Sequence, residues 1–410
     1  MTGQNKLVQA RRIQVRQGTQ HANVTPLELF FDLVFVFALT QVTAFMAHDI
    51  SAESVLRGAL IVVLLWWAWT GYAWLANVAS ADETAIKPVM LTSMAAMFVL
   101  ALCIPEAYVD GPGGLSGPIV FAVAYLVVRL LHLVIFFIVA GEDRGLRSQV
   151  VRFAPSVLGS TIVLLVASQF EGVTQTALWA LALVVDYLGT FLGGAAGWRL
   201  PAPSHFAERH GLIVIVALGE SIVAIGVGVA ERPISWPIIV ASGVGLLLAS
   251  TMWWAYFDVS ALQGEHALSS EPVETRPRLA RNAFSFAHLP IVVSIVLVAL
   301  GLKKVLEYVS DAEKHTLLDP LKGPALFALA GGTALYLLAH VLFKWLTVRH
   351  LSPFRLGAAV VLMGVFPFLG GVPALAQLAL VAALVGAAMA AESVAFAESR
   401  HQIRAELSRH

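Results

Sequence analysis

TPLELFFDLVFVFALTQVT, residues 25–43, is an apolar stretch with two acidic side chains in its opening turns. Thr25, Pro26 and Glu28 match the start of a helix, with a Thr-x-x-Glu capping box and proline at the first helical position. Capping by itself would explain Glu28. Asp32 lies one turn deeper on the same face, roughly 9 Å beyond the helix start. An ionised side chain at that depth in a lipid-spanning helix needs a partner or water, so Asp32 is a candidate functional residue.

The composition of the whole chain indicates an integral membrane protein. Of its 410 residues, 58% are hydrophobic and 13% are charged, and the mean hydropathy is +0.80, far more apolar than a soluble globular protein. The 26 basic and 26 acidic side chains cancel, so charge gives no reason to expect a nucleic-acid partner. The single cysteine, Cys103, excludes an internal disulfide. The expected surroundings are the lipid bilayer.

Apolar runs long enough to cross a bilayer of about 30 Å predict an all-α bundle of twelve transmembrane helices. The first six fall near residues 27–47, 54–79, 87–104, 117–140, 151–168 and 174–197. The second six fall near residues 207–230, 236–258, 281–301, 323–347, 355–370 and 372–395. The charged segment between the eighth and ninth runs, residues 261–281, is expected to be a solvated connector.

The basic residues predict the orientation of these helices. With the N-terminus inside, nineteen of the 26 lysines and arginines fall in cytoplasmic segments and five in outer segments, which agrees with the positive-inside rule. Both termini are therefore expected to be cytoplasmic. The predicted parts are a cytoplasmic N-terminal tail, two six-helix halves and a cytoplasmic C-terminal tail, at residues 1–26, 27–200, 201–397 and 398–410.

The second half contains a weak repeat of the first. Because six helices precede the repeat, the two halves would share one orientation and be related by an axis along the membrane normal. The offsets between paired segments are 179, 187 and 211 residues, a drift that loop insertions would explain. The pairs are LVFVFAL (33–39) with LIVIVAL (212–218), WWAW (66–69) with WWAY (253–256), and YLVVRLLH (125–132) with YLLAHVLF (336–343).

The seventh predicted helix also carries an acid inside an apolar run. In SHFAERHGLIVIVALGESIVAIGVGVA, residues 204–230, Glu220 lies roughly 24 Å along the helix, close to the bilayer centre. Asp186 and Arg129 lie midway along the sixth and fourth helices. Unpaired charges at a helix centre cost about 2.5–3.5 kcal/mol each, so partners are expected. Arg129 can neutralise only one acid. If Asp186 pairs with it, Glu220 must be protonated, hydrated or coordinated.

Other polar residues in apolar surroundings are candidates for a solute, ion or proton site, or for a cytoplasmic gate. The site candidates are Gln41, His132 and His288, and the gate candidates are Glu208, Arg209 and His210. A static network is the alternative, since buried polar residues commonly hold membrane helices together. HExxH and HxxxH are absent, as are dinucleotide and nucleophile motifs, so neither a metal site nor a cofactor is expected.

Two segments, ELFFDLVFVFALTQVT (28–43) and ERHGLIVIVALGES (208–221), carry a resemblance that covers most of the chain. They resemble the bacterial low-temperature-requirement A (LtrA) family. The resemblance implies a multipass protein of the bacterial inner membrane, associated by name with growth in the cold, and it implies no substrate or mechanism. The motif positions it carries over are Glu28, Asp32, Gln41, Glu208, Arg209, His210, Gly219 and Glu220.

The leading functional hypothesis is a proton-coupled secondary transporter for a small solute or ion. Glu220 and Asp186 would hold the proton or cation, with Arg129 as a counter-charge or anion anchor. Glu28 and Asp32 would gate the cytoplasmic side. A channel that uses the same acids for selectivity is a variant. The alternative is an intramembrane enzyme or accessory factor acting on lipid or quinone, and a purely structural role for the acids is a third reading.

Overall fold

The computed structural model describes residues 23–230 and 232–396, and the regular elements in these ranges are helices. The predicted C-terminal tail and most of the predicted N-terminal tail lie outside the described residues. The helices up to the middle of the chain are α1 Pro26–His48, α2 Ala52–Val78, α3 Ile86–Leu102, η1 Ile104–Glu106, α4 Gly117–Ala140, α5 Arg144–Ala167 and α6 Gly172–Gly193. The others are α7 Pro203–Gly228, α8 Trp236–Phe257, α9 Ser260–Ser270, α10 Arg276–Leu279, η2 Ala280–Phe286, α11 His288–Ser310, α12 Gly323–Leu326, η3 Phe327–Gly331, α13 Gly332–Val348, α14 Pro353–Leu369 and α15 Ala374–Ala395.

The predicted twelve-helix membrane bundle is confirmed in the described part of the chain. Ten helical segments are long and apolar enough to cross a membrane, and the shorter apolar helices α3 and α14 complete the set. Some spans are assembled from several elements, because α10, η2 and α11 form one continuous helical segment, as do α12, η3 and α13. A π-helical stretch such as η2 inserts an extra residue into a helical turn and is frequent at functional sites.

The solvated connector expected at residues 261–281 is wrong, because α9 begins almost directly after α8 and packs against α7 and α13. Ser260, Gly264 and Leu268 recur every four residues and are buried on one face of α9. A Cβ on Gly264 would meet the ring of Phe343. The charged residues of this segment favoured the prediction of a solvated connector. The segment instead contains a helix whose small side chains allow it to approach its neighbours closely.

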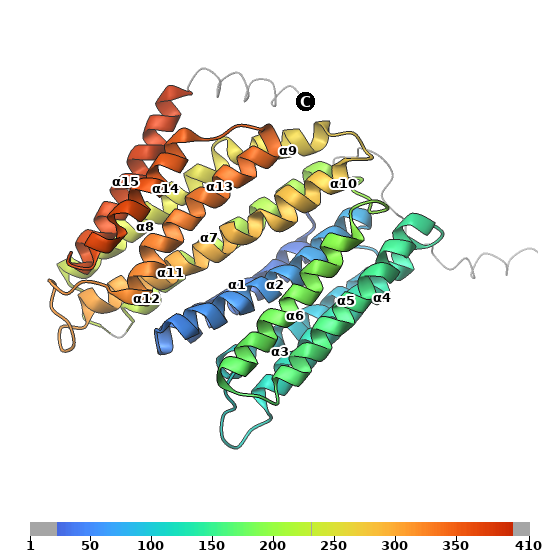
Figure 1. Ribbon diagram of the computed structural model, residues 1–410, viewed down its shortest axis with the longest axis horizontal. Coiled ribbons are helices and arrows are strands. Elements are labelled where there is room, and N and C mark those ends of the chain that lie inside the picture. Colours follow the sequence, from blue (N-terminus) through green and yellow to red (C-terminus); the bar gives the residue numbers. More distant parts are fainter. Residues whose placement is uncertain (1–22, 231, 397–410) are drawn as a thin grey trace, which may run out of the picture.

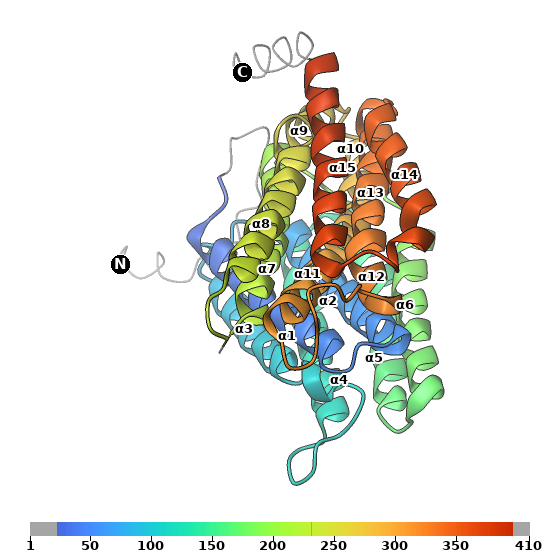
Figure 2. The same ribbon diagram turned by 90° about the vertical axis from the view of Figure 1, so that its left-hand side faces the viewer.

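The two parts of the chain lie on opposite sides of the bundle (Figure 1). Helices α1–α6 form one side, and α7–α15 form the other. Figure 2 shows long helices of the second part, among them α8, α13, α14 and α15, with their axes roughly parallel. Among the ten long spans, those containing α2 and α11 are the most deeply buried. In each of them, 78% of the residues in the most apolar stretch lie inside the bundle. Helix α11 contacts α1, α2 and α7, so it lies at the junction between the two parts.

Gly301 marks a close approach between α11 and η3. A Cβ at this position would lie 2.6 Å from both the backbone nitrogen and the Cα of Leu329. Because backbone atoms cannot move aside as a flexible side chain can, Gly301→Ala should lower the free energy of unfolding by about 1–3 kcal/mol. Unfolding of the purified protein in detergent measures this loss. Gly243→Ala on α8 is the control, since its added Cβ would meet no atom within 4 Å. Equal losses in both variants would contradict a packing cause.

Candidate functional site

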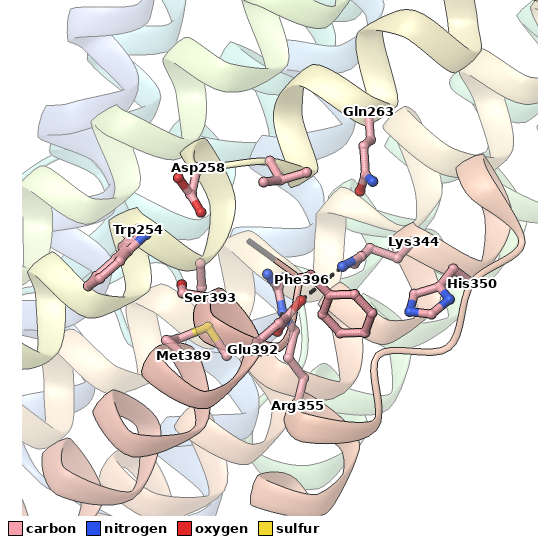
Figure 3. Close-up of a pocket in the computed structure, with 12 residues that line it drawn as sticks. Trp254, Asp258, Gln263, Lys344, His350, Arg355, Met389, Glu392, Ser393 and Phe396 are labelled. Atoms are coloured by element: carbon pink, nitrogen blue, oxygen red, sulfur yellow. Dashed lines mark hydrogen bonds and ion pairs between the residues drawn. The ribbon is translucent and has the colours of Figure 1, made fainter. Parts of the chain in front are cut away.

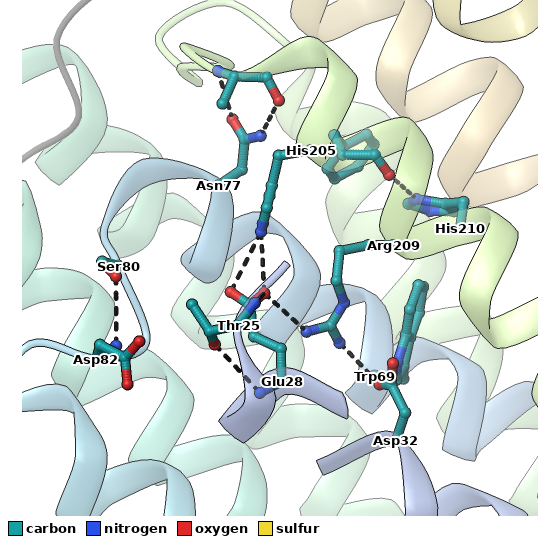
Figure 4. A network of polar contacts seen from close by, with 12 residues as sticks. Thr25, Glu28, Asp32, Trp69, Asn77, Ser80, Asp82, His205, Arg209 and His210 are labelled. Carbon is teal, nitrogen blue, oxygen red and sulfur yellow. Dashed lines mark hydrogen bonds and ion pairs between the residues drawn. The ribbon is translucent and has the colours of Figure 1, made fainter. Parts of the chain in front are cut away.

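Helices α1 and α7 present a buried ionic cluster where they face each other, here called the α1–α7 cluster (Figure 4). His205 Nε2 donates to the Glu28 carboxylate at 3.0 Å, and Arg209 Nη2 donates to Asp32 Oδ1 at 2.8 Å. Arg209 Nη1 lies 3.7 Å from Glu28 Oε2, so one guanidinium contacts both acids. Trp69 Nε1 of α2 also donates to Asp32 Oδ1, at 2.8 Å. None of these five residues is more than 2% exposed.

The positions of these residues in the sequence explain the α1–α7 cluster. Glu28 and Asp32 are four residues apart, as are His205 and Arg209, so each pair lies on one helix face. Both contacts join residues 177 apart, which requires α1 and α7 to run in the same direction. The predicted capping box is present, with Thr25 Oγ1 accepting from the Glu28 amide and the Glu28 carboxylate accepting from the Thr25 amide. Glu28 therefore caps α1 and also binds α7.

The α1–α7 cluster is short of one positive charge when His205 is neutral. Its two carboxylates face a single guanidinium, so the formal charges of the acids and the arginine do not balance. Asp32 Oδ2, Arg209 Nε and His205 Nδ1 make no hydrogen bond to any residue that the structure describes. Buried polar networks with unpaired atoms are costly. The arrangement is therefore suited to taking up a proton.

Arg129 and Asp186 form the second buried ionic contact, between α4 and α6. Arg129 Nη2 lies 2.9 Å from Asp186 Oδ1 and 3.0 Å from Oδ2, and Arg129 Nη1 donates to the Trp67 carbonyl at 3.3 Å. Tyr125 donates its hydroxyl to Asp186 Oδ2 at 3.2 Å, from one turn before Arg129 on α4. Both charged side chains are 1% exposed. Arg129 therefore neutralises Asp186. Glu220 must then be stabilised by something other than Arg129.

Glu220 of α7 faces Thr40 of α1 and forms no salt bridge within the described residues. It is 1% exposed. Thr40 Oγ1 lies 2.5 Å from Glu220 Oε2 and 3.1 Å from the carbonyl oxygen of Val36. Lys303 of α11 is close enough to attract the carboxylate, yet the two do not form an ion pair. Glu220 therefore differs from Glu28, which lies beside an arginine.

The hydroxyl of Thr40 has one hydrogen and cannot donate to both of its neighbours at once. When Thr40 donates to Glu220, the carboxylate can be ionised. When Thr40 donates to the Val36 carbonyl, the short contact requires a protonated Glu220 that donates to Thr40. The same heavy-atom positions therefore accommodate both protonation states: Glu220 gains or loses a proton and the hydroxyl hydrogen of Thr40 rotates.

The three predicted gate residues point in different directions, because successive residues on a helix are turned by about 100°. Glu208 is exposed, Arg209 belongs to the α1–α7 cluster, and His210 packs edge-on against the Trp69 ring, with centroids 5.0 Å apart. His210 Nδ1 donates to the carbonyl of Phe206 at 2.8 Å. Of the three, only Arg209 contacts the acids of α1.

The remaining predicted residues are separated from the acids. His288 Nδ1 donates to the Ala283 carbonyl at 3.0 Å, and its Nε2 accepts from the Tyr256 hydroxyl at 2.8 Å. His132 is buried beside Gly71, and within residues 23–230 and 232–396 neither ring nitrogen has a hydrogen-bond partner of good geometry. Gln41 is half-buried and belongs to neither ionic contact.

Sequence reasoning does not select the neutral partners of these charges, Thr40, Trp69 and Tyr125, as site residues. One feature of the sequence does point to the position of Thr40. The offset of 179 residues between the repeated segments of α1 and α7 is close to the 177 and 180 residues that separate contacting side chains. Positions related by the repeat therefore face each other, and Glu220 should lie opposite a residue near position 41.

A further polar cluster lies at an open pocket formed by the second part of the chain (Figure 3). Glu392 of α15 accepts from Lys344 Nζ at 2.9 Å and from Arg355 Nε at 2.8 Å. Arg355 Nη1 donates to Ser260 Oγ at 3.1 Å. These contacts link α9, α13, α14 and α15. We interpret this cluster as structural, because its charges are engaged with one another.

Comparison with known proteins agrees with the resemblance seen in the sequence. Residues 23–390 match the family described as bacterial low temperature requirement A protein (LtrA). The uncharacterized protein RA0937 of Rhizobium meliloti (strain 1021) is 30% identical over 361 residues, which cover 82% of this chain and 80% of the relative. No solved structure matches the chain. With a helical membrane bundle and a family match over nearly its whole length, the chain belongs to the bacterial low temperature requirement A family.

Proposed function

We propose that this protein is a proton-coupled secondary transporter for a small solute, in which Glu220 takes up and releases the coupled proton. The observation that carries the proposal is the Thr40 hydroxyl shared between Glu220 and the Val36 carbonyl. Intramembrane acids usually have a charged partner or mark an ion or proton pathway. Asp186 has such a partner, whereas Glu220 has a neutral hydroxyl that serves both of its protonation states.

In the proposal, two six-helix halves, residues 27–200 and 201–397, move against each other at the contact between α1 and α7. Helices related by an axis along the membrane normal, and close to that axis, contact each other at equivalent positions. The contact offsets of 177 and 180 residues agree with such a relation. Because Glu220 and Thr40 come from different halves, rearrangement of this contact would change the access of Glu220 to water.

The α1–α7 cluster is the proposed gate on the cytoplasmic side of a bacterial inner membrane, with both chain termini cytoplasmic. The contacts of Glu28 with His205 and of Asp32 with Arg209 must break before α1 and α7 can separate. Protonation of a carboxylate removes its ionic attraction to arginine. A proton that binds the carboxylate of Glu28 or Asp32 would therefore favour opening, which links proton movement to the conformational change.

Proton flux into liposomes containing the purified protein tests the proposal. A membrane potential drives protons inward, and a dye trapped inside reports the internal pH, with candidate solutes added outside. Glu220→Gln should reduce protein-dependent flux to the level of protein-free liposomes, since glutamine cannot exchange a proton. Glu171→Gln is the matched control, because Glu171 is exposed at the start of α6.

Two outcomes would contradict the proposal once thermal unfolding shows that the variants are folded. One is a flux in Glu220→Gln equal to that of the wild type. The other is a wild-type protein that moves neither protons nor solutes over a range of pH and cations. Conversion of lipid or quinone without flux would instead favour the enzyme alternative.

A further inference from the structure

Helices α7 and α11 run in the same direction and contact each other near both ends of α7. Near the start of α7, the rings of His210 and His288 lie 5.2 Å apart between centroids. At the end of α7, a Cβ on Gly228 would lie 3.0 Å from the carbonyl oxygen of Lys303 and 3.4 Å from its Cα. Lys303 therefore lies beside Gly228, roughly 12 Å further along the bundle than Glu220 at 1.5 Å per residue.

The Lys303 ammonium has no fixed partner. Lys303 is half-buried and belongs to a helical segment long and apolar enough to cross a membrane. The next residue, Lys304, donates to the Ala47 carbonyl of α1 and to the Glu307 carboxylate, each at 2.7 Å. Within the part of the chain that the structure describes, Lys303 makes no such contact. Cations in spanning helices are normally paired, so the free ammonium needs an explanation.

Two carboxylates attract the Lys303 ammonium from different sides, Glu307 on α11 and Glu220 on α7. Glu307 is four residues after Lys303 and lies on the same face of α11. Because the Cα–Cβ bond of a helical residue tilts toward the helix start, the lysine stem leaves α11 in the direction of Glu220. Its four flexible carbons then allow the ammonium to take more than one position.

The surroundings of the two carboxylates differ in hydration. Glu307 lines an open pocket of about 280 Å³ together with Gly228 and Asp311. This pocket, here called the distal pocket, lies at the end of α7 opposite the α1–α7 cluster. The Glu307 side chain is 35% exposed, whereas Glu220 is 1% exposed. An ammonium near Glu307 is therefore hydrated, and one near Glu220 depends on the ionised carboxylate to offset its lost hydration.

Few other charged groups act on this part of α7. The groups that influence the Glu220 carboxylate are the hydroxyls of Thr40 and Thr43 and the Lys303 ammonium. Helix α8 contains no charged residue, and α1 has none between Asp32 and His48. The other charged or titratable residues on helices packed against α7 lie nearer the helix ends: Glu53 and Arg57 of α2, and Glu265 and His266 of α9.

We propose that Lys303 is a movable counter-charge for Glu220: its ammonium approaches the carboxylate when Glu220 is ionised and returns to Glu307 at the distal pocket when Glu220 is protonated. The described arrangement, with Thr40 at Glu220 and the ammonium apart, corresponds to the protonated state. The inference rests on the proposed function in one respect, that Glu220 exchanges a proton. It does not depend on movement of a solute.

Infrared difference spectra of the full-length protein in lipid membranes, recorded across a pH series, follow the protonated carboxyl group of Glu220. Its band is identified by its loss in Glu220→Gln. Lys303→Met should raise the midpoint pH of this band by about one unit, a tenfold change in proton affinity, because the ionised carboxylate loses its cation. Lys303→Arg should keep the midpoint near that of the wild type, since it retains the charge.

Lys314→Met is the matched control, because Lys314 is exposed and lines the same pocket. It removes an equal charge and should leave the midpoint unchanged. An unshifted midpoint in Lys303→Met, or equal shifts in both methionine variants, overturns the inference while Glu220 still titrates. A Glu220 band that is absent at every pH would overturn the proposed function as well.

A second measurement follows the position of Lys303 itself. A water-soluble succinimidyl ester acylates accessible lysines, and mass spectrometry gives the rate at each one. At a pH above the wild-type midpoint, Lys303 should react severalfold faster in Glu220→Gln than in the wild type, because the neutral amide no longer attracts the ammonium inward. Lys314 in the same samples is the internal control and should react equally in both proteins. Equal Lys303 rates would show that the ammonium does not move.

Discussion

Asp186→Leu is expected to lower the free energy of unfolding by about 3–5 kcal/mol, the cost of removing one partner of a buried ion pair. Asp186 and Arg129 are 2.9 Å apart at their closest atoms, and both side chains are 1% exposed. A guanidinium does not lose its proton inside proteins, so Arg129 would remain charged within the bundle. Thermal and denaturant unfolding of the purified protein in detergent measures the loss.

Arg129→Met is the informative comparison for this pair. Arg129→Met should lower the free energy of unfolding less than Asp186→Leu does. The reason is that an aspartate left without its arginine can take up a proton and become neutral. The double variant Asp186→Leu with Arg129→Met should recover most of the stability, since an apolar pair of similar volume needs no counter-charge. Wild-type stability in Asp186→Leu alone would show that Asp186 is not what neutralises Arg129.

Arg209→Met is expected to lower the free energy of unfolding by about 3–5 kcal/mol at neutral pH, for a related reason. Arg209 contacts both Asp32 and Glu28, and its removal would leave two buried carboxylates with His205 as their remaining basic partner. The loss should shrink as the pH falls, because protonated carboxyl groups no longer require a cation. Unfolding of the variant and of the wild type across a pH series measures the difference.

Two further variants separate charge from packing at Arg209. Adding Glu28→Gln and Asp32→Asn to Arg209→Met should reduce the loss, because the acids are then neutral at every pH. Arg278→Met removes an exposed arginine and should change stability little. A deficit in Arg209→Met that is the same at all pH values would mean that lost packing, rather than unbalanced charge, explains it.

Much of the architecture follows from the sequence alone. The lengths of the apolar runs predicted twelve spans because a bilayer has a nearly constant thickness, and the described residues contain ten long and two short apolar helices. The capping box at Thr25 was predictable because it depends only on residues three apart. Helix α9 was not predicted, because the charged residues of this segment indicated a solvated connector. The small residues that pack α9 against α7 and α13 gave a weaker signal in the sequence.

The sequence by itself determined which side chains would be anomalous: Asp32, Arg129, Asp186 and Glu220 are ionisable residues in apolar surroundings, whatever their neighbours. Only the tertiary structure decided their partners. Arg129 could have bound either acid, since hydropathy and spacing along one helix say nothing about which helices become adjacent. Packing placed Asp186 beside Arg129 and Glu220 beside Thr40. Those contacts between distant segments determine which acid is neutralised by a cation and which relies on a hydroxyl.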